Sequence, residues 1–464
     1  MDILTIRLSA DKTQPLYQQL YKYISTRISD GEIKSGEKLP SKRALASHLA
    51  ISLNTVDTAY QMLVAEGFAE ARPKSGFYVC KIETLEQSIL SIRIYSEKKP
   101  SDPNCKFSFK TNSIDTSLFP YKTWARIQRD ILTSHPEFLN HGDRDGDIEL
   151  RRSIARYLHE YRGVVCSEDR IIVGAGIEYL VGLLANLFYP KCFALENPGY
   201  KRVFNILKNN NIPVCFVPVD ENGLVVSSLA ESASDIVYVT PSHQFPTGAT
   251  MPMSRRAELL SWANQSDERY IIEDDYDSEF RFDTKPIPAL QGLDSGDKVI
   301  YISTFSRIIA PSIRIAYMVL PKSLTADYTR LFSSYSSTVS RFEQHTLCRF
   351  IDDGHFSRHL NRVRVAYRSR RDFLIKTLLD HFGKEQIKIS GAHTGLHLLV
   401  QVLNGMDESE LVRSAANAGV KLTGISAYYM GGKIRSEATV ILGYSALKEE
   451  EIFKACDLLK LTWS

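Results

Sequence analysis

The stretch Tyr270-Ile271-Ile272-Glu273-Asp274-Asp275-Tyr276-Asp277-Ser278-Glu279-Phe280 begins as a short apolar run and continues into a cluster of acidic residues. Short apolar runs recur from about residue 105 onward, at 171–173, 214–217, 236–239 and 299–302, and helical stretches separate them. Alternation of buried strands with helices is typical of an α/β domain. This part of the chain is therefore predicted to fold around a mostly parallel central sheet.

Length and composition place the chain among globular proteins. Its 464 residues are too many for one ordinary core and predict two or three domains. Apolar residues make up 44% and charged residues 24%, which excludes a disordered chain. Because the net charge is only +3, any basic surface that binds nucleic acid must be local.

The N-terminus and the cysteines bear on the cellular compartment. Met1-Asp2-Ile3-Leu4 has no charged-then-apolar signal pattern, and the most apolar later stretch, 179–195, is interrupted by Asn186, Pro190 and Lys191. The seven cysteines never form a C-x-x-C pair, so they are predicted to be reduced thiols. The sequence predicts a cytoplasmic protein without a membrane span.

The N-terminal part has the pattern of a small helical unit that ends in a hairpin. Apolar residues at helical spacing predict three helices, with Ser41 and Ser52 suited to cap the second and third. Alternating residues on either side of a turn then predict a two-stranded wing. The predicted ranges are 15–28, 41–49 and 52–66 for the helices and 68–70 and 76–80 for the wing.

Loss of periodicity marks a boundary after the wing. Residues 81–104 collect charged residues and prolines without an apolar repeat, as linkers do. We therefore predict a winged helix-turn-helix domain over 1–80, a linker over 81–104 and a second domain over 105–464.

The first domain carries a family resemblance along its whole length. The stretch from Pro15-Leu16-Tyr17-Gln18-Gln19-Leu20 to Val79, with Leu39-Pro40-Ser41-Lys42-Arg43 inside it, resembles the GntR-type DNA-binding domain. The resemblance implies a double-stranded DNA operator as partner, with the start of the third helix in a major groove. The family's usual arginine at position 53 is replaced by Leu53. A solvated basic face on a protein-interaction module is the alternative.

Side-chain chemistry assigns roles within this domain. Short polar side chains at the start of the third helix can read base edges, and basic side chains before it and in the wing can contact phosphates. The predicted base contacts are Ser52, Asn54 and Thr55, and the predicted phosphate contacts are Lys42, Arg43, Arg72 and Lys74.

Four segments of the second domain resemble class I aminotransferases of fold type I, and specifically the MocR/GabR-type regulators that fuse this domain to a winged helix. The segments are Glu196-Asn197-Pro198-Gly199-Tyr200, Pro241-Ser242-His243-Gln244-Phe245-Pro246-Thr247-Gly248, Glu273-Asp274-Asp275-Tyr276-Asp277-Ser278-Glu279-Phe280 and Ser303-Thr304-Phe305-Ser306-Arg307. The resemblance implies a homodimeric, fold type I aminotransferase-like domain with a pocket for pyridoxal phosphate (PLP) or a related small anionic effector.

Two parts of this pocket have a physical reason in the sequence. Ile177 and Glu178 begin a helix after an apolar strand, so their amides can bind a phosphate unless the segment is only a tight turn. Asp274 follows a strand and can pair with the pyridine nitrogen of PLP, and Tyr276 can bind the ring hydroxyl.

The resemblance implies the remaining contacts. They are Tyr200, Thr304, Ser306 and Arg314 for the cofactor, and Arg202 and His243 for an effector. A surface helix charge is the alternative for Arg202, and a structural hydrogen-bonding histidine is the alternative for His243. The acidic neighbours of Asp274 are predicted to start a helix or face solvent, and they are Glu273, Asp275 and Asp277.

Arg307 occupies the position at which the resembled aminotransferases hold PLP through a lysine Schiff base. Transamination needs a neutral amine. Lysine, with an ordinary pKa of about 10.4, needs about 4.6 kcal/mol to lose its proton at pH 7, whereas arginine needs about 7.5 to 9 kcal/mol. The nearest other lysines do not share this position, and they are Lys285, Lys298 and Lys322. A covalent Schiff base is therefore not expected, and no residue is predicted to be catalytic.

Together these features predict a sequence-specific DNA-binding transcription regulator. Its second domain is a degenerate aminotransferase that senses PLP non-covalently, with Arg307 among the contacts, or senses a related anionic effector. Two alternatives stay open, namely a PLP-dependent aminotransferase tethered to DNA, which Arg307 disfavours, and a regulator that ignores PLP.

Overall fold

The chain divides into two compact units, Met1–Ser101 and Asp102–Ser464. The computed structural model describes residues 6, 15–73, 75–81, 105–283, 287–431 and 437–463. The division falls within the stretch predicted as a linker, 81–104, of which only Lys81 belongs to the described residues.

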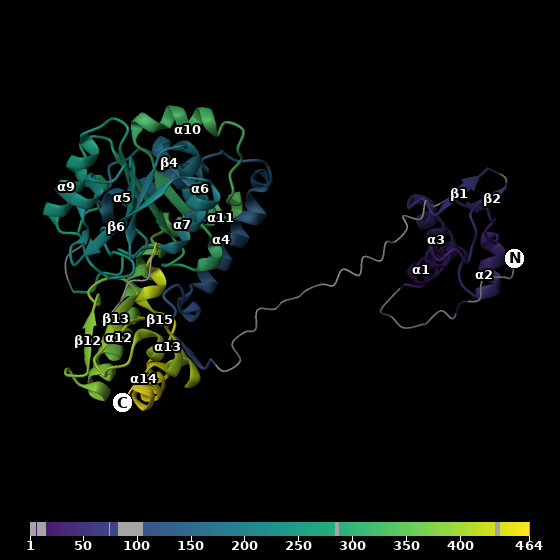
Figure 1. Cartoon of the computed structure of the whole chain (residues 1–464). Helices are drawn as coiled ribbons and strands as arrows, with labels where there is room; N and C mark the ends of the chain where they lie inside the picture. The colour runs from purple at the N-terminus through teal and green to yellow at the C-terminus, as the bar shows by residue number, and fades with distance from the viewer. Residues whose placement is uncertain are drawn as a thin grey trace. The chain divides into compact units, whose positions relative to one another are not determined.

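The first unit is a winged helix-turn-helix, as predicted (Figure 1). Ser41 Oγ accepts a hydrogen bond from the Ala44 amide at 3.2 Å, and Ser52 Oγ accepts one from the Thr55 amide at 3.0 Å. These caps satisfy amides that have no partner inside a helix and so set where the second and third helices begin. The elements are α1 (Leu16–Ser29), α2 (Lys42–Leu49), α3 (Leu53–Ala65), β1 (Ala69–Arg72) and β2 (Gly76–Val79).

Apolar side chains from all three helices form the core of this unit. Leu20, Leu45, Val56 and Tyr60 are each fully buried, and the antiparallel hairpin β1–β2 closes against them through Val79. The spacing of these residues is the helical spacing seen in the sequence. The recognition helix α3 is therefore held rigidly while its first turn stays at the surface.

The second unit is built around an eight-stranded sheet in the order β4-β11-β10-β9-β8-β5-β6-β7. The five central strands from β10 to β6 run parallel, and β11 and β7 pair antiparallel to their neighbours. The prediction of a mostly parallel sheet is confirmed, and each apolar run from the sequence lies in one of its strands. The bounds are β4 (Ile171–Gly174), β5 (Phe193–Asn197), β6 (Val214–Asp220), β7 (Gly223–Leu224), β8 (Ile236–Val239), β9 (Tyr270–Asp274), β10 (Val299–Thr304) and β11 (Ala316–Val319).

Helices cover both faces of this sheet because its strands are apolar on both sides. Ile236 and Tyr238 of β8 pack with α6, α7 and α10, whereas Val237 and Val239 pack with α8 and α9 on the opposite face. Next to them, α4, α5 and α11 cover β4, β10 and β11. The bounds are α4 (Tyr121–Ser134), α5 (Ile148–Arg162), α6 (Ile177–Leu187), α7 (Lys201–Asn209), α8 (Val226–Ala230), α9 (Met253–Asn264), α10 (Thr325–Leu331) and α11 (Arg341–Asp352).

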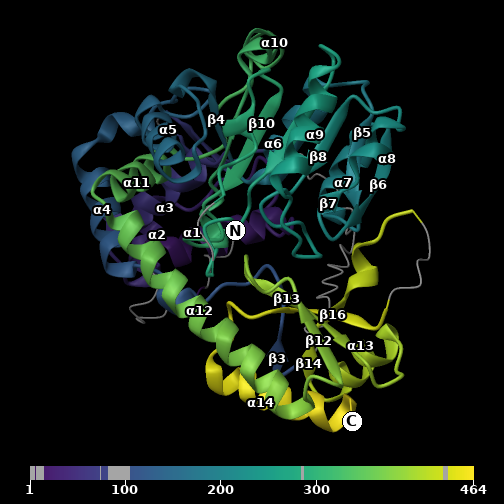
Figure 2. The same ribbon diagram turned by 90° about the vertical axis from the view of Figure 1, so that its left-hand side faces the viewer.

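A long helix leads from this sheet to a smaller, C-terminal subdomain. Figure 2 shows α12 running from α11 to a four-stranded sheet of order β12-β13-β16-β15, where it packs against α14. A two-residue strand near residue 107 pairs with β14, so the start of the second unit is tied to its end. The bounds are β3 (Phe107–Ser108), α12 (His355–Phe382), β12 (Ile387–Ser390), β13 (His397–Val402), α13 (Glu408–Asn417), β14 (Val420–Lys421), β15 (Thr423–Gly424), β16 (Thr439–Gly443) and α14 (Glu449–Trp463).

Within the described ranges, no helix has both the length and the apolar character that crossing a membrane requires.

Candidate functional site

A cavity of about 490 Å³ lies at the carboxyl ends of β8, β9 and β10 in the second unit. This is the edge at which open α/β sheets bind ligands, because loops and helix N-termini converge there. Strand ends contribute Thr240, Asp274, Tyr276, Thr304, Ser306 and Arg307, and the starts of α6 and α7 contribute Gly176, Ile177, Glu178, Tyr200, Lys201 and Arg202. Other loops contribute Lys110, Thr111, Asn112, Phe245, Pro311, Arg314, Thr423 and Tyr428.

Asp274 is the last residue of β9 and is 3% exposed. Tyr238 donates a hydrogen bond to its Oδ2 at 2.5 Å, and its Oδ1 has no hydrogen-bond partner within the described structure. Burial raises the pKa of Asp274 to about 7. A buried carboxyl group with one free oxygen at the cavity wall is suited to a cationic N–H donor.

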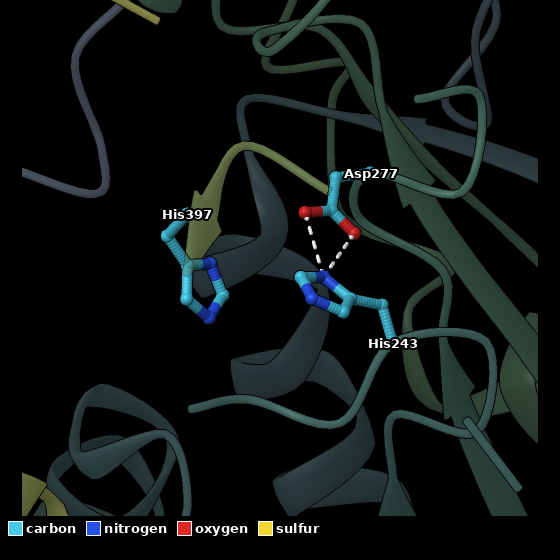
Figure 3. A group of neighbouring side chains, drawn as sticks. All are labelled: His243, Asp277 and His397. Atoms are coloured by element: carbon cyan, nitrogen blue, oxygen red, sulfur yellow. Dashed lines mark hydrogen bonds and ion pairs between the residues drawn. The ribbon is translucent and has the colours of Figure 1, made fainter. Parts of the chain in front are cut away.

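Tyr276 connects the cavity to a buried histidine, His243, which lies beside Asp277 and His397 in Figure 3. Its hydroxyl lies 2.9 Å from His243 Nδ1, which is 3.0 Å from Asp277 Oδ2 and 3.1 Å from Asp277 Oδ1. His397 stands next to His243, with ring centroids 4.8 Å apart, and donates from Nε2 to the Pro246 carbonyl at 3.1 Å. Burial holds the pKa of His397 well below its usual range.

This arrangement determines how Tyr276 is oriented. Because Asp277 faces His243 Nδ1, we assign the proton to that nitrogen, which then donates to both Asp277 and the Tyr276 oxygen. The Tyr276 hydroxyl proton is thereby free to point into the cavity. His243 itself is 1% exposed and lies behind Tyr276, outside the cavity lining, and its predicted contact with an effector stays a prediction.

Thr304, Ser306, Arg314 and the first amides of α6 line one part of the cavity, which we call the phosphate cup. Opposing charges fill this cup. Glu178 Oε2 accepts a hydrogen bond from Arg314 at 2.7 Å, and its Oε1 accepts one from Arg202 at 2.6 Å. Burial would raise the pKa of Glu178, but the Arg314 and Arg202 bonds and its own backbone N–H outweigh burial and lower the pKa to about 2. The cup therefore already holds a carboxylate.

Backbone geometry shapes the same cup. Gly176 precedes α6 with φ +96°, a backbone conformation that favours glycine, and a Cβ atom there would lie 2.2 Å from Arg314 Nη2 and displace this guanidinium. Thr304 Oγ1 accepts a hydrogen bond from the Ser306 amide at 3.2 Å and lies 3.0 Å from Ser306 Oγ. These hydroxyls and the first amides of α6 are suited to an anion.

Arg307 projects from the loop after β10 and is half-buried. Its Nη1 donates to the Thr111 carbonyl oxygen, and its guanidinium carbon lies 5.9 Å from the centroid of the Tyr276 ring. No carboxylate in the described part of the chain forms an ion pair with it. A permanent positive charge thus lies beside Tyr276 at the cavity.

The prediction that the acidic neighbours of Asp274 face solvent is wrong. Glu273, Asp275 and Asp277 are each at most 2% exposed. Glu273 accepts hydrogen bonds from the Leu290 and Gln291 amides, and Asp277 faces His243. These partners satisfy buried charges that the local sequence alone would leave at the surface.

Asp275 has the strongest of these partnerships. Arg162 Nε donates to Asp275 Oδ2 at 2.7 Å, and the Tyr301 hydroxyl donates to the same oxygen at 2.6 Å. Arg162 lies in α5, and no motif in the sequence linked it to the β9 segment. The pair fixes the loop that carries Asp274 and Tyr276.

The sequence did not predict several cavity residues, most notably two lysines. Lys110 and Lys201 line the cavity, whereas Lys298 and Lys322 do not, and Lys285 lies outside the described residues. The only sequence signal for Lys201 was its place directly after Tyr200. Nothing in the local sequence pointed to Lys110, Thr111 or Tyr428, because they reach the cavity through tertiary packing.

In the first unit, the side chains of the predicted base contacts differ in exposure and in their hydrogen bonds within α3. Asn54 is exposed in the first turn of α3, whereas Ser52 is the N-cap and lies 2.8 Å from Thr55 Oγ1. Leu53 is 48% exposed between them. Among the three predicted base contacts, Asn54 is therefore the one whose side chain is least engaged in hydrogen bonds within the helix.

The predicted phosphate contacts also differ. Arg43 is exposed, and Lys42 pairs with Asp57 at 2.5 Å. Arg72 pairs with Glu70 at 2.6 Å and lies over the Tyr78 ring. Lys74 lies outside the described residues.

Comparison with known proteins covers both units. Residues 16–79 match the bacterial regulatory proteins of the gntR family, and residues 106–459 match the class I and II aminotransferases. The chain is 37% identical over 455 residues to the HTH-type transcriptional regulator YdeL of Bacillus subtilis, covering 97% of both chains. It is 30% identical to the HTH-type pyridoxine biosynthesis transcriptional regulator PdxR of Corynebacterium glutamicum, covering 97% of this chain and 96% of that one.

A solved structure agrees with the second match. The kynurenine aminotransferase of Pyrococcus horikoshii superimposes with a TM-score of 0.68 at 25% identity, covering 77% of this chain and 90% of that one. The fold type I domain is thus joined to a gntR-family domain in one chain. The chain belongs to the MocR/GabR-type transcriptional regulators, in which a gntR-family helix-turn-helix domain is fused to an aminotransferase-like domain.

Proposed function

We propose that the second unit is a sensing domain that binds PLP, or a related small anionic molecule, without a covalent bond and without catalysing transamination. The observation that carries this proposal is the position of the Arg307 side chain in the cavity lining. The side chain projects from the loop after β10, where the resembled aminotransferases carry their lysine. A guanidinium stays charged at neutral pH and does not attack an aldehyde.

The cavity residues fit the cofactor. The free oxygen of Asp274 suits a protonated ring nitrogen, and Tyr276 can donate to a ring hydroxyl. Thr304, Ser306 and the first amides of α6 suit a phosphate. Bound PLP would supply an electron sink for chemistry at an amino acid's α-carbon, but Arg307 provides no neutral amine to start that chemistry.

The raised pKa of Asp274 couples its ionisation to ligand binding. With a pKa raised to about 7 by burial, Asp274 is substantially protonated at neutral pH in the ligand-free protein. A cationic ring nitrogen favours the ionised form, so Asp274 gives up its proton as the ligand binds. The relation to PdxR, a regulator of pyridoxine biosynthesis by its name, supports a vitamin B6 compound as the ligand.

The DNA-binding unit supplies the output. We propose that Asn54, Ser52 and Thr55 face base edges in a major groove, while Lys42, Arg43, Arg72 and Lys74 face phosphates. A homodimer in the bacterial cytoplasm would present two such units to a two-fold symmetric operator. Ligand binding changes operator affinity only if the ligand favours one of two dimer arrangements.

A gel-shift titration on DNA upstream of the protein's own gene tests this function. We expect saturable, salt-sensitive, sequence-specific binding, with a midpoint that PLP shifts in the wild type and leaves unchanged in Asp274→Ala. Absence of specific binding would contradict the proposed base contacts. Specific binding that PLP never shifts would contradict sensing of this ligand.

An aminotransferase tethered to DNA is the second candidate function, and the two cavity lysines are the observation that favours it. Lys110 and Lys201 each place a primary amine at the cavity wall. Neither follows β10, and both side chains are exposed. Turnover of an amino acid with a keto acid that disappears in Lys110→Gln or Lys201→Gln would establish this candidate instead.

A further inference from the structure

Three cationic side chains of the cavity, Lys110, Lys201 and Arg307, form no ion pair among the described residues, and Arg307 is the one of the three that is half-buried. Arg202 and Arg314 share the carboxylate of Glu178, whereas Arg307 bonds only to the Thr111 carbonyl oxygen among the described residues. Asp274 also lines the cavity, but it forms no ion pair with Arg307, and burial raises its pKa to about 7. The part of the cavity around Arg307 therefore carries a net positive charge.

Such a charge favours an anionic ligand. A guanidinium has five N–H donors in one plane, and a single carbonyl oxygen satisfies only one of them. A half-buried charge without further hydrogen bonds is unfavourable, so the remaining donors are available to a ligand. The guanidinium plane suits two oxygens side by side, as in a carboxylate, better than a single aldehyde or alcohol oxygen.

The positions of four cavity residues indicate where on the ligand this carboxylate belongs. Ser306, next to Arg307 in the chain, belongs to the phosphate cup, and Tyr276, whose ring Arg307 faces, is the proposed partner of the ring hydroxyl. Asp274 is the proposed partner of the ring nitrogen. On a PLP skeleton, the ring carbon between the hydroxyl and the phosphate arm is also the one opposite the nitrogen, and in PLP it carries the aldehyde.

We infer that the preferred ligand is a phosphorylated hydroxypyridine that carries a carboxylate on that carbon, in place of the aldehyde, and that Arg307 selects it. This inference rests on the proposed function, because it assumes that the cavity holds a PLP-like ring. The carboxylate is the oxidised form of the aldehyde, so the selected compound is an oxidation product of PLP. The bond is a non-covalent, two-point ion pair, and no chemical step takes place in the protein.

Calorimetric titration of the full-length protein with three ligands tests the inference. The ligands are 4-pyridoxic acid 5′-phosphate, PLP and pyridoxine 5′-phosphate, which differ only in the group at that carbon. We expect the acid to bind about tenfold to a hundredfold more tightly than the alcohol, as charge-assisted paired hydrogen bonds typically provide. The ratio of two affinities from one preparation does not depend on the fraction of folded protein.

Variants of Arg307 locate the source of the preference. In Arg307→Gln we expect the acid and the alcohol to bind with similar affinity, and in Arg307→Lys we expect an intermediate ratio because the charge stays but the paired geometry is lost. Lys208→Gln removes an exposed cation of α7 outside the cavity lining and should leave the wild-type ratio unchanged.

The outcomes separate this inference from the function on which it rests. Equal binding of all three ligands overturns the inference and leaves PLP sensing intact. A preference that persists in Arg307→Gln overturns the role of Arg307. No binding of any of the three overturns both the inference and the proposed PLP-type ligand.

Discussion

Glu178 Oε2 accepts a hydrogen bond from Arg314 Nη2 at 2.7 Å, at the entrance to helix α6. Its second oxygen binds Arg202, and its own backbone N–H adds to the stabilisation. The carboxylate thus occupies the guanidinium groups and the helix N-terminus that would receive a ligand's phosphate. A phosphate that enters this cup must compete with a negative charge belonging to the protein.

The first prediction follows from this competition. Glu178→Gln removes the charge while keeping the shape, so Arg202 and Arg314 become free to bind a phosphate. Since both arginines are about half exposed, we expect affinity for PLP to increase by about threefold to tenfold rather than more. Calorimetric titration at neutral pH measures the change.

A matched control separates this local effect from a general change in charge. Glu168→Gln removes a carboxylate that pairs with Arg152 at 3.1 Å outside the cavity lining, and it should leave PLP affinity unchanged. Weaker binding in Glu178→Gln would mean that Glu178 supports the phosphate cup instead of competing for it.

The second prediction concerns pH and the stability of the ligand-free protein. Burial raises the folded-state pKa of Asp274 from 3.8 to about 7, so folded protein keeps a proton that unfolded protein has lost. Its contribution to stability is complete below about pH 4 and is lost as the pH rises toward 7. Over that window the loss amounts to at most about 4 kcal/mol.

Asp274→Asn removes this titration and keeps a side chain of similar size. Urea unfolding at a series of pH values should show the variant gaining stability relative to the wild type between about pH 4 and pH 7. Burial also raises the pKa values of three other carboxyl groups to about 7, namely Glu196, Glu273 and Glu279. Their contributions to the pH dependence of stability are the same in both proteins and cancel in the comparison. A difference between the two proteins that stays constant with pH would show that Asp274 is ionised in the ligand-free protein.

Part of this site could be predicted from the sequence, because it follows from local rules. Asp274 and Tyr276 were expected at the ligand edge since they follow an apolar run, and residues after parallel strands meet at that edge. The caps Ser41 and Ser52 were expected for an equally local reason. Each of these predictions needed only a short window of residues.

Other features of the site depend on side-chain contacts between residues that are distant along the chain. Asp275 is buried because Arg162, in another helix, supplies its counter-charge. Glu178 was expected to offer its amide to a phosphate, and its side chain instead occupies the cup because Arg202 and Arg314 reach it from two other segments. Periodicity and motif spacing carry no information on such encounters.

The third prediction separates base reading from phosphate binding in the first unit. Asn54→Ala should weaken binding to the specific operator about tenfold to a hundredfold and leave nonspecific DNA binding nearly unchanged, since an amide reads base edges. Fluorescence anisotropy with operator and scrambled duplexes at one salt concentration measures both. An equal loss of affinity for the two duplexes would mean that Asn54 contacts the DNA backbone and not the bases.

The fourth prediction concerns Arg43→Ala, which removes a predicted phosphate contact instead of a predicted base contact. Arg43 is exposed, so its removal should weaken specific and nonspecific binding alike. The slope of log affinity against log salt concentration should fall by about one, because one phosphate contact is lost. An unchanged slope would exclude Arg43 from the DNA-binding surface.

The fifth prediction introduces a primary amine at position 307. Arg307→Lys places a primary amine at the cavity beside Tyr276, where the surrounding groups are largely buried, and we expect it to bond covalently to PLP. After borohydride reduction and denaturation, intact-mass spectrometry should find the cofactor attached to Arg307→Lys and absent from the wild type. Cofactor attached to the wild type would identify another lysine, such as Lys110 or Lys201, as the point of attachment.

The most direct test of the central claim is calorimetric titration of the full-length wild-type protein with PLP. The claim of a non-covalent sensing pocket predicts a saturable isotherm with a single site per chain, cofactor that dialysis removes completely, and loss of the binding heat in Asp274→Ala. A wild-type titration without saturable heat, or cofactor that survives dialysis in denaturant, would contradict it.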